Sequence, residues 1–138
     1  MRPTPLIRPA TFLLTLTAGI GIGAGLARTS YPPLDILLST SQTIIGQDIA
    51  YPEGSPKITA AIVTMQPGAK TGLHRHNVPL FAYIMDGEIA VDYGPDGTRN
   101  YHPGDAFLEA LHTPHEGHVV GTDPVRLLAV FMGADSTP

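Results

Sequence analysis

The sequence predicts an all-β domain, either a sandwich or a barrel. Short segments of β-favouring residues follow one another from Lys57 to Phe131, and turns containing Gly or Pro separate them. After residue 27, no segment keeps an apolar period of 3.6 over the length of a helix. The 138 residues suffice for one domain with a substantial core and leave no room for two.

Residues 1–27 read as a targeting segment that precedes this domain. Arg2 and Arg8 give it a positive start, and no charged residue occurs from Ala10 to Ala27. Gly25 and Ala27 place small residues at the positions that favour cleavage after Ala27. The uncharged run also reaches the lower limit for crossing a bilayer of about 30 Å, so a membrane anchor is the alternative. We therefore expect a periplasmic or secreted domain, either released or anchored by residues 10–27.

Residues 28–56 are expected to form a linker and the first strands. Tyr31-Pro32-Pro33 is a stiff connection, because proline cannot occupy a regular helix interior. The segments 34–39 and 43–51 are apolar or β-favouring, and the first could instead form a helical turn. Pro52 to Pro56 has the composition of a turn.

Residues 57–138 are expected to form the barrel. We predict its strands at Lys57–Met65, Leu80–Met85, Glu88–Tyr93, Thr98–Tyr101, Ala106–Glu109, His115–Val120 and Val125–Phe131. Because side chains alternate along a strand, the side chains of Leu80, Ala82 and Ile84 should face inward together. Those of residues 81, 83 and 85 then face a neighbouring sheet or a subunit contact.

Composition excludes several classes of function. The chain has no cysteine, so disulfides, thiolate metal sites and cysteine nucleophiles are absent, and histidine and carboxylate remain as metal ligands. The net charge is −4 and Lys and Arg do not cluster, which argues against a nucleic-acid partner. A small molecule is the expected ligand, and membrane contact is expected only through an uncleaved N-terminal segment.

Two histidines in one short stretch predict a metal site. His74 and His76 are separated by one residue, and in extended chain such side chains point to the same side. Both imidazoles can therefore reach one ion. A third ligand must come from elsewhere in the chain, and His115 is the best candidate.

The stretch around these histidines resembles the first motif of the cupins. That motif has a glycine, an H-x-H pair, a glutamate and a second glycine, and Gly68, His74, His76 and Gly87 stand at its spacings. Leu80 occupies the position of the glutamate. This position is the one departure from the motif.

A later stretch resembles the second cupin motif more weakly. Gly104 and His115 are kept, whereas residues 110–112 replace the P-x-G turn and Val119 replaces the final asparagine. The resemblance extends over roughly Lys57 to Phe131 and implies a single jelly-roll barrel. It also implies a homodimer, because small cupins are often dimers.

The resemblance implies that His74, His76 and His115 bind a divalent metal. Since leucine cannot coordinate, Leu80 would leave three neutral imidazoles and more than one open position. Such a ligand set suits Fe, Mn, Ni, Cu or Zn.

Two further residues are candidates for proton transfer. Glu109 follows an apolar run and shares the facing of Phe107, so it is a proton carrier, a partner of the ligands, a substitute fourth ligand, or a rim carboxylate in water. His112 lies in the loop before His115, as a proton shuttle or as an exposed loop residue. The remaining histidines are expected outside the site.

The sequence thus predicts an exported cupin with metal-assisted chemistry on a small molecule, either of dioxygenase type or as a lyase or isomerase. The alternative is a non-catalytic periplasmic module that binds a metal or a small ligand, and the missing glutamate favours it.

Overall fold

The computed structural model describes residues 32–135. The predicted signal or anchor at residues 1–27 lies outside this range, and the residues from Leu34 onward belong to one unit. In the part of the chain that is described, no helix has both the length and the apolar character needed to cross a membrane.

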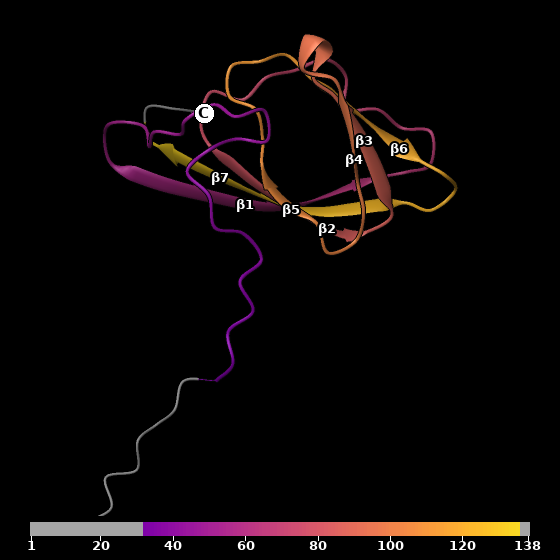
Figure 1. Cartoon of the computed structure of the whole chain (residues 1–138), viewed down its shortest axis with the longest axis horizontal. Coiled ribbons are helices and arrows are strands. Elements are labelled where there is room, and N and C mark those ends of the chain that lie inside the picture. The colour runs from indigo at the N-terminus through magenta and orange to yellow at the C-terminus, as the bar shows by residue number, and fades with distance from the viewer. Residues whose placement is uncertain (1–31, 136–138) are drawn as a thin grey trace, which may run out of the picture. The chain divides into compact units, whose positions relative to one another are not determined.

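Within residues 32–135, the fold consists of seven strands and one short 3-10 helix (Figure 1). They are β1 (Pro56–Met65), β2 (Leu80–Asp86), β3 (Glu88–Asp92), η1 (Gly94–Asp96), β4 (Thr98–Tyr101), β5 (Ala106–Leu108), β6 (Glu116–Val120) and β7 (Val125–Ala134). Every strand predicted between residues 57 and 131 is present, with ends that differ by a few residues at most.

The strands form two antiparallel sheets (Figure 1). One sheet has the order β1-β7-β2-β5 and the other the order β4-β3-β6. The all-β prediction is confirmed, but the predicted closed barrel is not found, because no ladder joins the two sheets in residues 32–135. The connection between β1 and β2 makes only isolated bridges, at Lys70, His74 and His76, and so leaves the sandwich open there.

The core lies between the two sheets, as the alternation along β2 predicts. Leu80, Ala82 and Ile84 are buried, at 5%, 3% and 0% exposure. The antiparallel register places them opposite Phe131, Ala129 and Leu127 of β7. The inward face of β2 is therefore the face that sequence alternation assigned to it.

The predicted strands at 34–39 and 43–51 are not formed. The second of these segments is a turn closed by an isolated bridge between Gln42 and Asp48. The hydroxyl of Thr43 accepts a hydrogen bond from the backbone N–H of Gln47 at 3.1 Å. Local side-chain bonds of this kind satisfy backbone groups that a strand would have paired with a neighbour.

The tight turn that carries the chain from β2 in one sheet to β3 in the other depends on Gly87, which gives a stability prediction. Its φ is +73°, and a Cβ there would lie 2.4 Å from the carbonyl oxygen of Pro124. Gly87→Ala should therefore lower the free energy of unfolding by at least about 3 kcal/mol, measured by urea denaturation.

Gly94→Ala is the matched control for this prediction. Gly94 also has a positive φ, +62°, but a Cβ there would meet nothing within 4 Å. Its cost should be only about 1–2 kcal/mol, the backbone penalty alone. Equal losses in the two variants would contradict the role assigned to the Pro124 contact.

Candidate metal centre

Two loops meet at the open end of the sandwich and bring the three histidines together. The backbones of His74 and His115 exchange two hydrogen bonds, at 3.0 Å from the N–H of His74 and 2.8 Å from the N–H of His115. The N–H of His112 donates to the carbonyl of His76 at 2.8 Å. These bonds position His115 beside a pair that lies about forty residues earlier in the chain.

The histidine rings surround a common space. Their centroids are 5.0 Å apart for His74 and His76, 4.6 Å for His74 and His115, and 5.1 Å for His76 and His115. One nitrogen of each ring lies within 4.8 Å of the others. Ligand nitrogens around one ion at about 2.1 Å can be up to roughly 4.2 Å apart, so small rotations suffice and the three residues could hold an ion.

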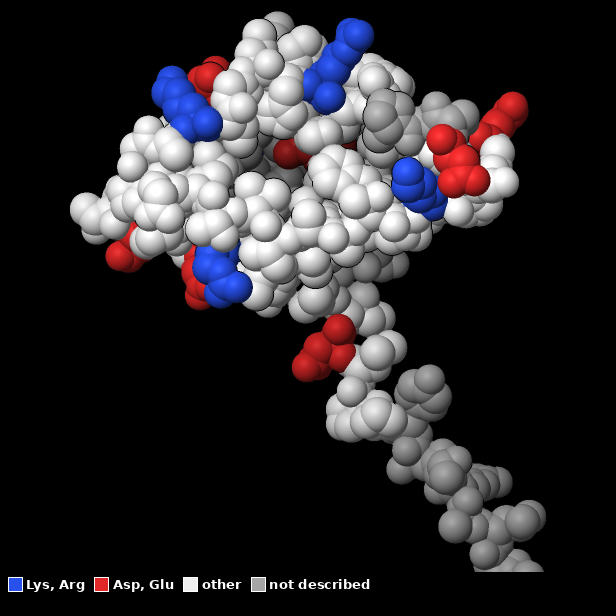
Figure 2. Space-filling model, turned by 180° about the vertical axis from the view of Figure 1, so that it is seen from behind, with Lys and Arg blue, Asp and Glu red and all other residues white. Residues whose placement is uncertain are grey.

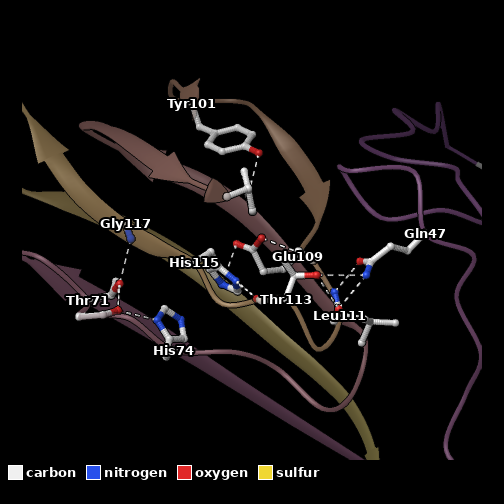
Figure 3. A network of polar contacts seen from close by, with 12 residues as sticks. Gln47, Thr71, His74, Tyr101, Glu109, Leu111, Thr113, His115 and Gly117 are labelled. Carbon is white, nitrogen blue, oxygen red and sulfur yellow. Dashed lines mark hydrogen bonds and ion pairs between the residues drawn. The ribbon is translucent and has the colours of Figure 1, made fainter. Parts of the chain in front are cut away.

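Backbone carbonyls orient two of the rings. Nδ1 of His74 donates to the carbonyl of Gly72 at 2.8 Å, and Nδ1 of His115 donates to the carbonyl of Thr113 at 2.9 Å (Figure 3). When Nδ1 carries the proton, Nε2 keeps its lone pair. This is the tautomer in which Nε2 can bind a metal.

Nε2 of His115 is the most informative atom of the site. The residue is 1% exposed, and within the described residues this nitrogen is buried with no hydrogen-bond partner. Buried polar atoms rarely go unpaired, because desolvation without a compensating bond is costly. A metal ion among the three rings would pair it, so the donor set fits the expected cofactor.

The electrostatics of His76 agree with this role. Burial, followed by the neighbouring imidazoles of His115 and His74, lowers the pKa of His76 to about 4. The ring is therefore neutral at pH 7, and its lone pair is available to an ion without loss of a proton.

Glu109 lies next to this group and is itself buried, at 7% exposure (Figure 3). Its Oε1 accepts a hydrogen bond from the N–H of Ala110 at 2.8 Å, and its Oε2 is 3.8 Å from Nε2 of His115. It faces inward, so the rim position considered from the sequence is wrong.

Two buried tyrosines adjoin the carboxylate. The hydroxyls of Tyr93 and Tyr101 are 3.0 Å apart. Burial above all, with the charge of Glu109 as a further cause, raises the pKa of each above its usual value. Both phenols therefore stay protonated at neutral pH, and Glu109 is the carboxyl side chain that lies beside the histidines.

A cavity of about 210 Å³ opens onto the site. The polar side chains that line it are Thr71, Glu109 and the three histidines, and the rest of its wall is apolar apart from Gly117. Leu80 is part of that wall, on the side where the cupin glutamate was expected. Figure 2 shows a hollow on one face of the molecule, with atoms of an acidic residue visible inside it.

His112 does not line this cavity. It is exposed, with a positive φ of 57°, and its Nδ1 lies 3.4 Å from Oδ1 of Asn77. The other proton-transfer candidate, Glu109, is the one that the fold brings to the histidines.

Gln47 has a positioning role that the sequence did not indicate. Its side-chain amide donates to the carbonyl of Leu111 and accepts from the N–H of the same residue, both at 2.8 Å (Figure 3). It also donates to the hydroxyl of Thr113 at 3.3 Å. These bonds fix the loop that carries His115, and nothing local in the sequence marks a glutamine more than sixty residues away.

The fold and the site together define a class: two packed antiparallel sheets with a cluster of three histidines at the open end. A cupin-domain family model matches residues 61–131, and the chain belongs to the cupin family. None of the curated proteins matches it in sequence.

Solved structures agree with the fold. The DMSP lyase DddQ from Ruegeria pomeroyi DSS-3 is 23% identical with a TM-score of 0.52, over 59% of this chain and 41% of the lyase. An RmlC-like cupin with a double-stranded β-helix fold from Methanocaldococcus jannaschii is 14% identical with a TM-score of 0.52, over 55% of this chain and 70% of that one.

A single-residue mutant of Bacillus subtilis oxalate decarboxylase OxdC is 28% identical with a TM-score of 0.50, over 58% of this chain. The matched part is only 22% of the decarboxylase. These similarities establish the fold, and two of these three neighbours are enzymes by name.

Proposed function

We propose that this chain is an exported cupin that binds one divalent transition metal through His74, His76 and His115. The observation that carries the proposal is the buried Nε2 of His115, which has no hydrogen-bond partner among residues 32–135 and lies beside the other two rings. The lowered pKa of His76 adds a neutral donor at physiological pH. Fe, Mn, Ni, Cu and Zn all accept imidazole ligands, so the ion's identity is left to experiment.

The substrate class follows from the cavity. Its wall is apolar except near the histidines, and its volume of about 210 Å³ suits a small molecule. With Leu80 in place of a carboxylate, the site carries one negative charge fewer, which favours an anionic or oxygen-donor group on the substrate. We therefore propose a small, partly apolar molecule that has an oxygen donor at one end.

Glu109 is proposed as the proton acceptor. Its Oε2 lies 3.8 Å from Nε2 of His115, and its side chain lines the cavity in which we propose that the substrate binds. The Ala110 N–H holds Oε1 and leaves Oε2 directed toward the site. A bound divalent ion would supply Lewis acidity, or O₂ activation if it is iron, as in a dioxygenase.

O₂ uptake with a panel of diketones, phenols and thiols tests the oxidoreductase form of this proposal, and a parallel assay for substrate loss without O₂ tests the lyase or isomerase form. If neither assay detects a reaction with metal present, the non-catalytic binding module is favoured. The buried Leu80 is the observation that favours that second candidate, because it removes a ligand position.

Glu109→Gln separates proton transfer from metal binding. We expect the variant to keep near-stoichiometric metal and to lose about 10²- to 10⁴-fold in turnover, the usual contribution of a general base. Glu88→Gln, at an exposed glutamate, is the control and should keep both properties. Loss of metal in Glu109→Gln would instead identify Glu109 as a fourth ligand.

Export is proposed from residues 1–27 alone. Fractionation of the producing cells, combined with the intact mass of the purified protein, tests it. A mass that begins at Arg28 supports cleavage, a full-length protein in the membrane fraction supports the anchor, and a full-length protein in the cytoplasm contradicts export.

A further inference from the structure

A turn formed by residues 42–48, the 42–48 turn, contacts the loop that carries His115. The turn lies outside the range of the cupin-domain match, residues 61–131. An isolated bridge closes it, and Ile44 packs against the core. The N–H of Ile44 donates to the carbonyl of Leu108 at 2.8 Å, at the end of β5. The turn is therefore attached to the sheet at the point where the chain leaves β5 for the His115 loop.

Gln47 makes the contact between the 42–48 turn and this loop (Figure 3). Its Oε1 accepts from the N–H of Leu111 at 2.8 Å and from the hydroxyl of Thr43 at 3.1 Å. Its Nε2 donates to the carbonyl of Leu111 at 2.8 Å and to the hydroxyl of Thr113 at 3.3 Å. A primary amide has two hydrogens to donate and two acceptor positions on its oxygen, so these four bonds use all of them. A polar side chain that is paired in this way is rigid and has one defined position.

The loop needs such support at His112 and at His115. His112 has a φ of +57°, and a residue other than glycine keeps this conformation only where its surroundings hold it. Gln47 holds the preceding residue, and the carbonyl of His76 accepts from the N–H of His112 at 2.8 Å. The carbonyl of Thr113 accepts the hydrogen bond from Nδ1 of His115, at 2.9 Å, that orients the His115 ring. Gln47 therefore fixes the backbone on which the position of this ring depends.

We propose that Gln47 is a positioning residue for the metal site, which holds residues 111–115 in the conformation that lets His115 bind an ion and so slows the release of that ion. The inference rests on the proposed three-histidine site. Residues that orient a ligand without binding the ion typically account for 10- to 100-fold in metal affinity. Release requires a ligand ring to move away, and a loop that is fixed at Leu111 and Thr113 restricts this movement. A turn that precedes the matched range thus supports the metal site within that range.

Gln47→Met, made in the full-length chain and loaded with Co²⁺, tests the proposal. Methionine has nearly the same length, but its thioether cannot donate a hydrogen bond and accepts only weakly. After addition of excess EDTA, the visible absorption of the bound Co²⁺ should decay about 10- to 100-fold faster than in the parent. Gln42→Met is the matched control, because it makes the same substitution in the same turn, at an exposed amide that donates to Asp48. It should release Co²⁺ at the rate of the parent.

Hydrogen exchange of the metal-free proteins measures the same effect without any ion. The N–H groups of three residues are hydrogen-bonded between the two histidine loops, and none of these bonds involves Gln47: His74, His112 and His115. If Gln47 holds the loop closed, these three groups should exchange at least about 10-fold faster in Gln47→Met than in the parent. The N–H groups of β3, far from the loop in the sequence, should keep the rates of the parent.

Two results with Co²⁺ would overturn the proposal. One is unchanged release from Gln47→Met, even if its melting temperature falls. The other is equally fast release from Gln42→Met, which would trace the effect to the stability of the turn. A parent that binds no Co²⁺ contradicts the three-histidine site instead. In that case the exchange experiment decides the role of Gln47: faster exchange supports it, and unchanged exchange overturns it.

If Gln47→Met does not fold, hydrogen exchange of the parent decides. The N–H of Leu111 is held by Gln47, and the N–H of His115 is held by the carbonyl of His74. If Gln47 controls the loop, one opening event exposes both groups, so their protection factors should agree. A His115 N–H that exchanges while that of Leu111 stays protected would overturn the proposal.

Discussion

Replacing His76 with alanine is expected to lower metal affinity by at least about 100-fold. Loss of a residue that only supports a ligand typically costs 10- to 100-fold, and His76 is proposed as a ligand itself. It is a better choice than His115, which is 1% exposed and whose removal would leave a hole in the core. The measurement is metal content and competitive Zn²⁺ or Co²⁺ titration of protein purified without a histidine tag.

His102→Ala is the control for this experiment. His102 is exposed and lies 3.8 Å from Glu88 and 3.6 Å from Asp105, outside the residues that line the cavity. It should keep the metal content of the parent. Equal metal in the parent and in His76→Ala would show that the three-histidine assignment is wrong.

Restoring the cupin carboxylate by Leu80→Glu should have opposite effects with and without metal. Without metal, a carboxylate in the place of a side chain that is 5% exposed is buried and unpaired, so the melting temperature should fall sharply. With metal, the carboxylate becomes a ligand. A tenfold tighter site stabilises the folded state by about 1.4 kcal/mol more, so the rise in melting temperature on adding metal should exceed that of the parent by about 5 °C or more.

Leu80→Gln separates the ligand effect from the effect of burying a polar group. Glutamine has nearly the same size but no charge, so it should destabilise the protein and gain no more from metal than the parent does. If metal raises the melting temperature of Leu80→Glu no more than that of Leu80→Gln, then residue 80 does not face the ion.

The sequence predicted most of the fold because the signals it uses are local. Alternation along Leu80–Ile84 predicts which side chains face inward, and the structure agrees. The Asp86-Gly87 pair also favours a hairpin, and this expectation is wrong, because β2 and β3 belong to different sheets and do not pair in residues 32–135. For the segment from Thr43 to Tyr51, the prediction of a strand was wrong. Its apolar residues favour a strand, but the Thr43 hydroxyl and Gln47 satisfy the backbone within the turn. The apolar pattern of the sequence alone does not show that side-chain hydrogen bonds compete with strand formation.

By itself, the sequence determined the fold class, the cupin family and the candidate ligands His74, His76 and His115. The spacing of residues within a motif shows which residues occupy the ligand positions, and that spacing is a local property of the sequence. The tertiary structure alone decided the rest: that Glu109 faces His115 while His112 faces outward, and that Gln47 holds the loop. These facts depend on contacts between residues far apart in the chain, which no spacing encodes.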